Sequence, residues 1–191
     1  MTQVDKAKQV VANAKKMVEN KDIIPVGIVS KELAETMSLA QIFVMSGMFA
    51  DTKSQAQGVV KILAGKELDL TPLQAMSNLY IVNGKVGMAS QLMASKIKSS
   101  GKYDYHIDEL TNEACTITFF EGKNGDKKEI GKISFTKDDA IKCGLVNKDS
   151  FKNYPKNMLF ARTLSNGFRF YCPDALKMNA YTEEEIMDIT Q

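Results

Sequence analysis

The chain has 191 residues, of which 44% are hydrophobic and 25% charged, and its formal net charge is +2. These values are ordinary for a soluble globular protein built as one domain with a core of its own. No apolar run approaches the ~20 residues that a membrane span needs, and no signal peptide is visible, so we expect a cytosolic protein without a membrane partner.

Three cysteines, Cys115, Cys143 and Cys172, occur without any C-x-x-C spacing. Such an odd, unpaired set argues against a disulfide framework or a zinc site. Because free cysteine is among the most buried residue types, we expect three buried thiols.

The first half of the chain predicts helices. Residues 3–20 carry an apolar stripe at helical spacing. A second helix is expected over residues 31–50, capped by Ser30, and a third over residues 52–65, ended by Gly65. The second has too many apolar positions for one-sided burial, so we expect some of them to contact another subunit. These positions are Met37, Leu39, Ile42, Phe43, Val44, Met45, Met48 and Phe49.

A helix, a hairpin and another helix are expected next. Thr71 and Pro72 suit the start of a short helix, since proline is well tolerated at the first helical position. The strand L-Y-I-V follows, and Asn83-Gly84 is a strong signal for a two-residue hairpin turn. Residues 88–99 then predict a helix with its apolar side toward a core.

Strands dominate the region after residue 100. We expect them near residues 103–108, 114–121 and 128–135, with the polar turn E-G-K-N-G-D joining the second and third. A short helix over residues 136–142 follows, and a longer helix begins at Pro155. This order predicts an α+β fold.

The helix that begins at Pro155 carries a polar stripe. Arg162, Asn166 and Arg169 fall within about 40° of one another at 100° per residue, with Ser165 at the stripe's edge. No acid lies three or four positions away from either arginine. The alternatives are that the stripe is solvated, or that it pairs with acids from elsewhere in the chain. Because arginine suits forked phosphate contacts, we expect it to bind a polyanion.

Other basic residues support a polyanion partner, because charges are sorted along the chain. Residues 151–172 contain no acid, residues 84–106 contain Asp104 alone, and an acidic tail starts at Asp174. Two basic segments that flank a sheet predict a groove along a phosphate backbone. The candidate DNA-binding residues are Lys85, Gln91, Lys96, Lys98, Lys152, Lys156, Arg162, Ser165, Asn166 and Arg169.

Signatures of enzymes are weak. The motif G-x-x-x-x-G-K-[ST] is missing, so no nucleotide cofactor is expected. The only histidine, His106, is assigned a structural role in a strand. Asp174 and Lys177 resemble part of a nuclease cluster but lack a second acid in the right context. We expect no catalytic residue, metal or cofactor; the alternatives are an oligomeric scaffold that does not bind DNA and a metal-dependent nuclease.

Two stretches together resemble the RecT family of phage single-strand annealing proteins. They are G-K-E-L-D-L-T-P-L-Q-A-M-S-N-L-Y-I-V-N-G-K-V-G-M-A-S-Q-L-M-A-S-K-I-K-S-S-G-K-Y-D-Y-H-I from Gly65 and F-K-N-Y-P-K-N-M-L-F-A-R-T-L-S-N-G-F-R-F-Y-C-P-D-A-L-K-M-N-A-Y-T-E-E-E from Phe151. The likeness covers roughly residues 35–188. It divides the chain into an N-terminal helical segment, residues 1–30, and an annealing domain, residues 31–191.

The resemblance implies a β-β-β-α core and a function in phage-type homologous recombination. Family members pair complementary single strands without ATP and hold the annealed duplex in a basic groove. They assemble into homo-oligomeric rings or filaments. Their partners are a phage exonuclease and the host single-strand-binding protein, which implies the cytoplasm of a bacterial host.

Overall fold

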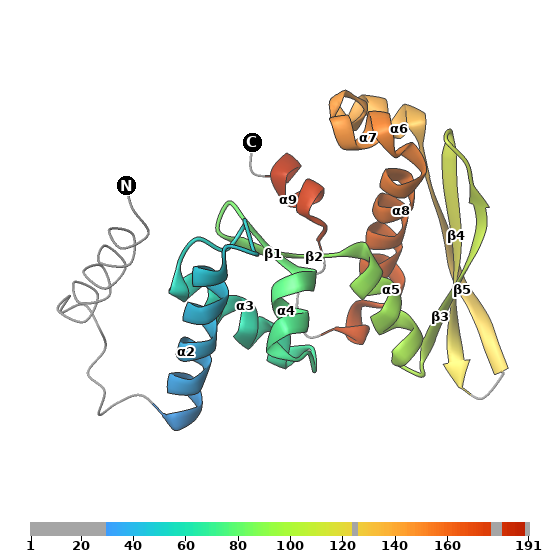
Figure 1. The fold of residues 1–191 in the computed structure, drawn as a ribbon. Coiled ribbons are helices and arrows are strands. Elements are labelled where there is room, and N and C mark those ends of the chain that lie inside the picture. Colours follow the sequence, from blue (N-terminus) through green and yellow to red (C-terminus); the bar gives the residue numbers. More distant parts are fainter. Residues whose placement is uncertain (1–29, 124–125, 177–180, 190–191) are drawn as a thin grey trace.

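The computed structural model describes residues 30–123, 126–176 and 181–189, and it contains both helices and antiparallel strands (Figure 1). The predicted α+β class is confirmed. The helix expected over residues 3–20 lies outside the described residues. The elements are α2 (Lys31–Ser46), α3 (Gln55–Glu67), α4 (Pro72–Asn78), β1 (Leu79–Val82), β2 (Lys85–Met88), α5 (Ser90–Ser99), β3 (Tyr103–Leu110), β4 (Ala114–Lys123), β5 (Asp126–Thr136), α6 (Lys137–Lys142), η1 (Leu145–Asn147), α7 (Asp149–Asn153), α8 (Pro155–Tyr171), η2 (Pro173–Ala175) and α9 (Glu183–Ile189).

Helix α2 starts as the sequence predicts, α3 starts three residues later than predicted, and both end elsewhere. The Ser30 hydroxyl caps α2 by accepting the Leu33 N–H at 3.2 Å. Helix α2 ends before Gly47, whose φ of 67° is the left-handed value favoured by glycine. Gly65 does not end α3: a Cβ there would lie 2.3 Å from the Cβ of Ala75, so this glycine lets α3 and α4 approach closely.

The β1–β2 hairpin has the predicted turn. Asn83 and Gly84 have φ values of 48° and 76°, and they join the antiparallel pair Val82 and Lys85. Helix α4 before it begins at Pro72 with a complete capping box. The strand β2 extends to Met88, so α5 starts two residues later than expected.

A buried lysine joins the N-terminal helices to this hairpin. The ammonium of Lys61 is fully buried and donates to Asp51 Oδ2 at 2.9 Å, to Thr52 Oγ1 at 3.2 Å and to the carbonyl of Met76 at 2.9 Å. The Ile81 N–H of β1 donates to the same Asp51 carboxylate at 3.0 Å. Every donor of the lysine is therefore satisfied, and the helices are fixed against β1.

The second sheet is antiparallel, with strand order β3-β4-β5, and α8 lies along one face of it (Figure 1). Cys115, Ile117 and Phe119 of β4 point into the core and are fully buried. Gly167 of α8 permits close packing, because a Cβ there would lie 2.2 Å from the Phe119 ring. The three strands and the long helix thus share one core, with two short helices, α6 and α7, between them along the chain.

The expectation of three buried thiols is correct for two of them. Cys115 and Cys172 are buried and free, and burial raises the pKa of Cys172 to about 12. Cys143 is free but exposed, because it follows the last turn of the surface helix α6. None of the described helices combines the length and the apolar character that a membrane span requires.

Candidate nucleic-acid interface

Helix α8 presents the predicted stripe because its two sides have different partners. Leu164 and Phe168 are 0% and 2% exposed and pack into the core below the sheet. On the opposite side, Arg169 Nη2 donates to Asn166 Oδ1 at 2.6 Å, and Arg162 lies two turns before Arg169. The arginines and the amide therefore share one face, as the spacing predicts.

The arginines do have carboxylate partners, which corrects the expectation of a stripe without acids. Arg169 Nη2 donates to Glu185 Oε1 at 2.9 Å, and Ser165 Oγ donates to Glu185 Oε2 at 2.5 Å. Asp188 forms an ion pair with Arg162 and a second one with Lys148 at 2.7 Å. Both acids belong to α9, so the stripe pairs with acids that are distant in sequence.

Helix α9 also removes the stripe from solvent. The side chains of Arg162 and Arg169 are 12% and 23% exposed, that of Glu185 is 3% exposed, and Ser165 is fully buried. The Arg169 guanidinium lies 4.5 Å from the ring centroid of Tyr181. A phosphate cannot reach the fork of Arg169 while α9 occupies this position.

The segment that carries α9 lies beside the β1–β2 hairpin (Figure 1). The Met88 N–H donates to the Tyr181 carbonyl at 2.8 Å. Ile186 is 1% exposed and fits against Gly87, where a Cβ would lie 2.9 Å from its Cδ1. Thr182 caps the helix by accepting the Glu185 N–H at 3.4 Å. Residues 181–189 thus bridge the hairpin and α8.

A groove of about 230 Å³ lies between the start of α5 and the first half of α8. Ser90 and Gln91 line it from α5, Asn157 from α8, and Glu183 and Glu184 from α9. The N-cap residue of α5, Ala89, makes no side-chain cap, so it satisfies none of the first N–H groups of the helix through its side chain. The groove thus offers amide and hydroxyl groups on two sides and carboxylates on the third.

Electrostatics make Glu183 an unfavourable neighbour in this groove. Burial raises its pKa, and the negative charges of Glu184 and Asp51 raise it further. Burial also raises the pKa of Tyr80, which lines the same groove. The ionised Glu183 carboxylate of α9 is therefore destabilised by burial and by repulsion from Glu184 and Asp51.

Three of the predicted lysines contact groups outside the groove. Lys96 donates to the Leu68 carbonyl, and Lys152 pairs with Asp149 at 3.3 Å. Lys98 pairs with Asp104, whose ionisation is opposed by burial; hydrogen bonds from Lys127 and Lys98 outweigh burial and lower its pKa to about 2. Lys96 and Lys98 occupy the last turns of α5, roughly 8 and 10 Å along the helix from Gln91 at about 1.5 Å per residue. These three lysines are not part of the groove.

Lys85 and Lys156 are exposed and form no ion pair within 4.0 Å among the described residues. Lys156 precedes Asn157, which lines the groove, and Lys85 lies on the strand that ends at Met88 of the same groove. Gln91 is exposed and lines the groove directly. Of the predicted residues, Gln91 lines the groove, Lys156 is next in sequence to its lining residue Asn157, and Lys85 lies three residues before its lining residue Met88.

Sequence reasoning missed Lys148, Asn157, Glu185 and Asp188 as residues of this region. The signal for the acids was the acidic tail, which has the opposite charge to the stripe. Their pairing depends on where α9 lies, which no local pattern specifies.

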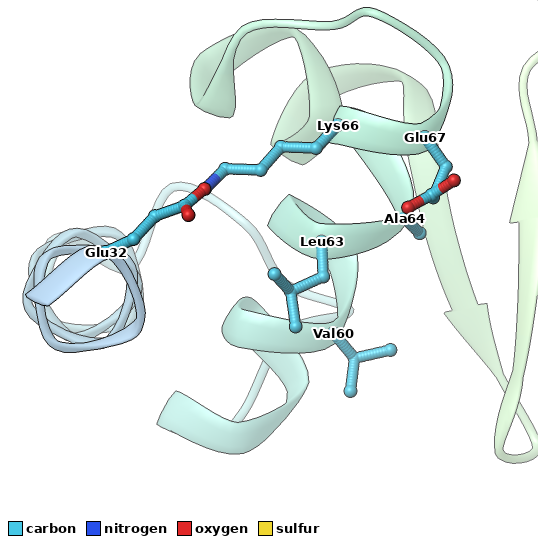
Figure 2. A pocket seen from close by; sticks show the side chains of 6 residues that line it. All are labelled: Glu32, Val60, Leu63, Ala64, Lys66 and Glu67. Carbon is cyan, nitrogen blue, oxygen red and sulfur yellow. The ribbon is translucent and has the colours of Figure 1, made fainter. Parts of the chain in front are cut away.

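A second surface of note consists of apolar side chains on the N-terminal helices. On α2, Ile42 and Met45 are 62% and 68% exposed. On α3, Val60 and Leu63 line a hollow of about 630 Å³, and Figure 2 shows Lys66 extending across toward Glu32 of α2. Other large exposed side chains of this surface are Leu39, Met48 and Leu73.

Among the described residues, no group of three or more His, Cys, Asp or Glu side chains is arranged to hold a metal ion. The chain matches no protein-family model, and searches of curated proteins and of solved structures found no match either.

Proposed function

We propose that this protein binds single-stranded DNA and promotes the pairing of complementary strands without a nucleotide cofactor. The observation that carries the proposal is the groove between α5 and α8. Gln91, Asn157 and Ala161 line this groove. The arginine stripe of α8 starts at the residue after Ala161. Amide, backbone N–H and guanidinium donors contact phosphate oxygens without reading sequence, which is what annealing of arbitrary strands requires.

Exposed positive charge near this groove supports the proposal. Lys85 and Lys156 form no ion pair with a described residue, so they are available to replace the counterions of a phosphate backbone. Among the described residues, Tyr80 is the one aromatic side chain that lines the groove. Binding through the backbone would leave the bases free to pair, whereas stacking platforms would hold them.

The RecT resemblance supports the same function from a different direction. Its first sequence block supplies α4, the β1–β2 hairpin and α5, and its second supplies α8. These are the two walls of the groove. In this proposal the protein acts in phage-type recombination in a bacterial cytoplasm, assembles into rings or filaments, and works beside an exonuclease and the host single-strand-binding protein.

A second candidate is an oligomeric scaffold that does not bind DNA. The exposed apolar side chains of α2 and α3, including Ile42, Met45 and Val60, favour self-association. Self-association is also part of the annealing proposal, so only a DNA-binding measurement separates the two functions.

The test is an annealing assay with two complementary labelled oligonucleotides, at several salt concentrations, with and without ATP and with and without EDTA. We expect annealing in every case, and an affinity for single strands that falls with salt. Replacing both Lys85 and Lys156 by alanine should lower the magnitude of the log-affinity against log-salt slope by about 1.4.

A matched control replaces Lys137 and Lys142 of α6 by alanine and so removes the same charge. These two lysines pair with Glu113 and Asp139, away from the groove. An equal change of slope in both double variants would place binding elsewhere. No binding at low salt would favour the scaffold, dependence on ATP would contradict the cofactor-free mechanism, and oligonucleotides shortened only without EDTA would indicate a nuclease.

A further inference from the structure

The acids of α9 contact the arginine stripe in the way that a phosphate backbone would. Glu185 accepts two hydrogen bonds from the fork of Arg169, at 2.9 and 3.2 Å. Asp188 pairs with Arg162 and Lys148. Successive carboxylates on one short segment thus neutralise successive cations, which is the pattern expected for a bound polyanion.

The fit between α9 and the stripe is incomplete. The Nε of Arg162 is buried and has no hydrogen-bond acceptor among the described residues. Buried donors are nearly always paired, so an orphan at this position indicates that α9 is an imperfect partner for the guanidinium. Glu183, on the same segment, lies in the groove close to Glu184 and Asp51, which have the same charge.

Polar contacts dominate what holds the segment in place. Among the described residues, the Met88 N–H donates to the Tyr181 carbonyl and joins the segment to the hairpin, and Ile186 is its buried apolar side chain besides the polar network. Helix α9 has seven residues, which is too short for a stable helix once its tertiary contacts are lost.

We propose that residues 181–189 form an acidic strap that covers the arginine stripe in the free protein and that a phosphate backbone displaces. The proposal rests on the proposed function, since it names the regulation of the same site. Displacement exposes Arg162, Arg169 and Lys148 at once. Because only the fraction of molecules with the strap released is competent to use the stripe, the strap lowers the apparent affinity for single strands.

The test compares two variants of the full chain that each lose one negative charge through an Asp→Asn change. Asp188→Asn removes the partner of Arg162 and Lys148. Asp138 of α6 is exposed, does not line the groove and forms no ion pair with a described residue, so Asp138→Asn is the matched control. The side chain of Asp188 is 24% exposed, so its neutral analogue is compatible with the fold.

The probes are a fluorescent oligothymidine and, separately, inorganic polyphosphate. We expect Asp188→Asn to bind oligothymidine at least about fivefold more tightly than Asp138→Asn does. Its log-affinity against log-salt slope should be steeper by about 1.4, because two further cations become available. Equal affinities and slopes in the two variants would overturn the proposal.

Polyphosphate separates the failure of this proposal from the failure of the DNA-binding function. If no variant binds oligothymidine but Asp188→Asn binds polyphosphate more tightly than Asp138→Asn does, the DNA function fails and the strap stands. If neither probe distinguishes the variants, residues 181–189 are a fixed part of the fold that a polyanion does not displace, and the strap proposal fails.

Hydrogen exchange of the wild-type protein gives an independent readout. Amides of residues 181–189 should exchange faster when saturating oligothymidine is present, because a displaced α9 unfolds. Slower or unchanged exchange of this segment would mean that α9 stays on the stripe when ligand binds, and would overturn the proposal.

Discussion

Lys61 and Arg162 are both buried cations, but their surroundings differ. Lys61 is fully buried, and all its donors reach Asp51, Thr52 and the Met76 carbonyl, which lie within 15 residues of it. Arg162 is 12% exposed, its Nε has no acceptor among the described residues, and its partner Asp188 comes from the far end of α9. Complete hydrogen bonding marks Lys61 as part of the fold, whereas the incomplete hydrogen bonding of Arg162 is one of the observations behind the strap that we propose.

The largest change in the free energy of unfolding is expected at Lys61, whose hydrogen bonds are complete. Lys61→Met leaves the Asp51 carboxylate without its partner and should lower the free energy of unfolding by about 3 kcal/mol. Hydrogen bonds from Lys61 lower the pKa of Asp51 against the opposing effect of burial, so the wild-type stabilisation is present above the unfolded pKa near 3.9 and is lost as the pH falls below it.

Chemical denaturation at pH 7 and at low pH measures this difference. The matched control is Lys66→Met on the same helix, because Lys66 pairs with Glu32, whose side chain is 77% exposed, and should cost less than about 1 kcal/mol. Equal costs for the two variants would mean that the Asp51 contact adds nothing beyond a surface pair.

A smaller cost is expected on α8. Arg169→Ala should lower the free energy of unfolding by about 2 kcal/mol, because Glu185 would lose its cation but α9 can detach and hydrate the carboxylate. For an unpaired surface arginine the cost would be under about 1 kcal/mol.

A double-mutant cycle with Glu185→Gln isolates this contact. Thermal and urea unfolding of both single variants and the double variant should give a coupling energy of at least about 1 kcal/mol. Additive costs would show that the ion pair at 2.9 Å contributes nothing of its own.

The N-terminal helices differ from α8 in a second way, since their exposed surface is apolar. Ile42→Ser combined with Met45→Ser should abolish self-association and change the free energy of unfolding by less than about 0.5 kcal/mol, because both side chains are more than half exposed. Light scattering over a range of protein concentrations measures the effect. The control replaces Leu110 and Ile141, exposed apolar residues outside the N-terminal helices. A wild-type protein that is monomeric at high concentration would contradict the prediction.

The smallest effect concerns Glu183. Its pKa in the folded protein is raised by burial and by Glu184 and Asp51, so the ionised side chain destabilises the fold as the pH rises above the unfolded value near 4.3. Glu183→Gln should therefore raise the thermal midpoint at pH 7. The corresponding gain in the free energy of unfolding should be no more than about 0.5 kcal/mol. The gain should vanish below about pH 4, where the Glu183 side chain of the wild type is as neutral as the glutamine that replaces it. A gain that persists at low pH would exclude a charge effect.

Local features were predicted best because each depends on a few adjacent residues. The Ser30 cap, the Asn83-Gly84 turn and the start of α8 at Pro155 are all correct. The identity of the stripe was also predictable, since Arg162 and Arg169 share a face whenever the segment is helical. The short helices α7 and α9 were missed, because five and seven residues carry too little periodicity to be recognised.

Sequence by itself determined the α+β class, the three-stranded sheet region, the turn and cap positions and the amphipathic α8, because these follow from side-chain periodicity and local backbone preference. Only the tertiary structure decided that Gly65 continues a helix, because the requirement there is the close approach of Ala75. It also decided that Glu185 and Asp188 cover the stripe. Ion pairs between segments that are far apart in sequence depend on the packing of the whole chain, since charge acts through space and leaves no local pattern.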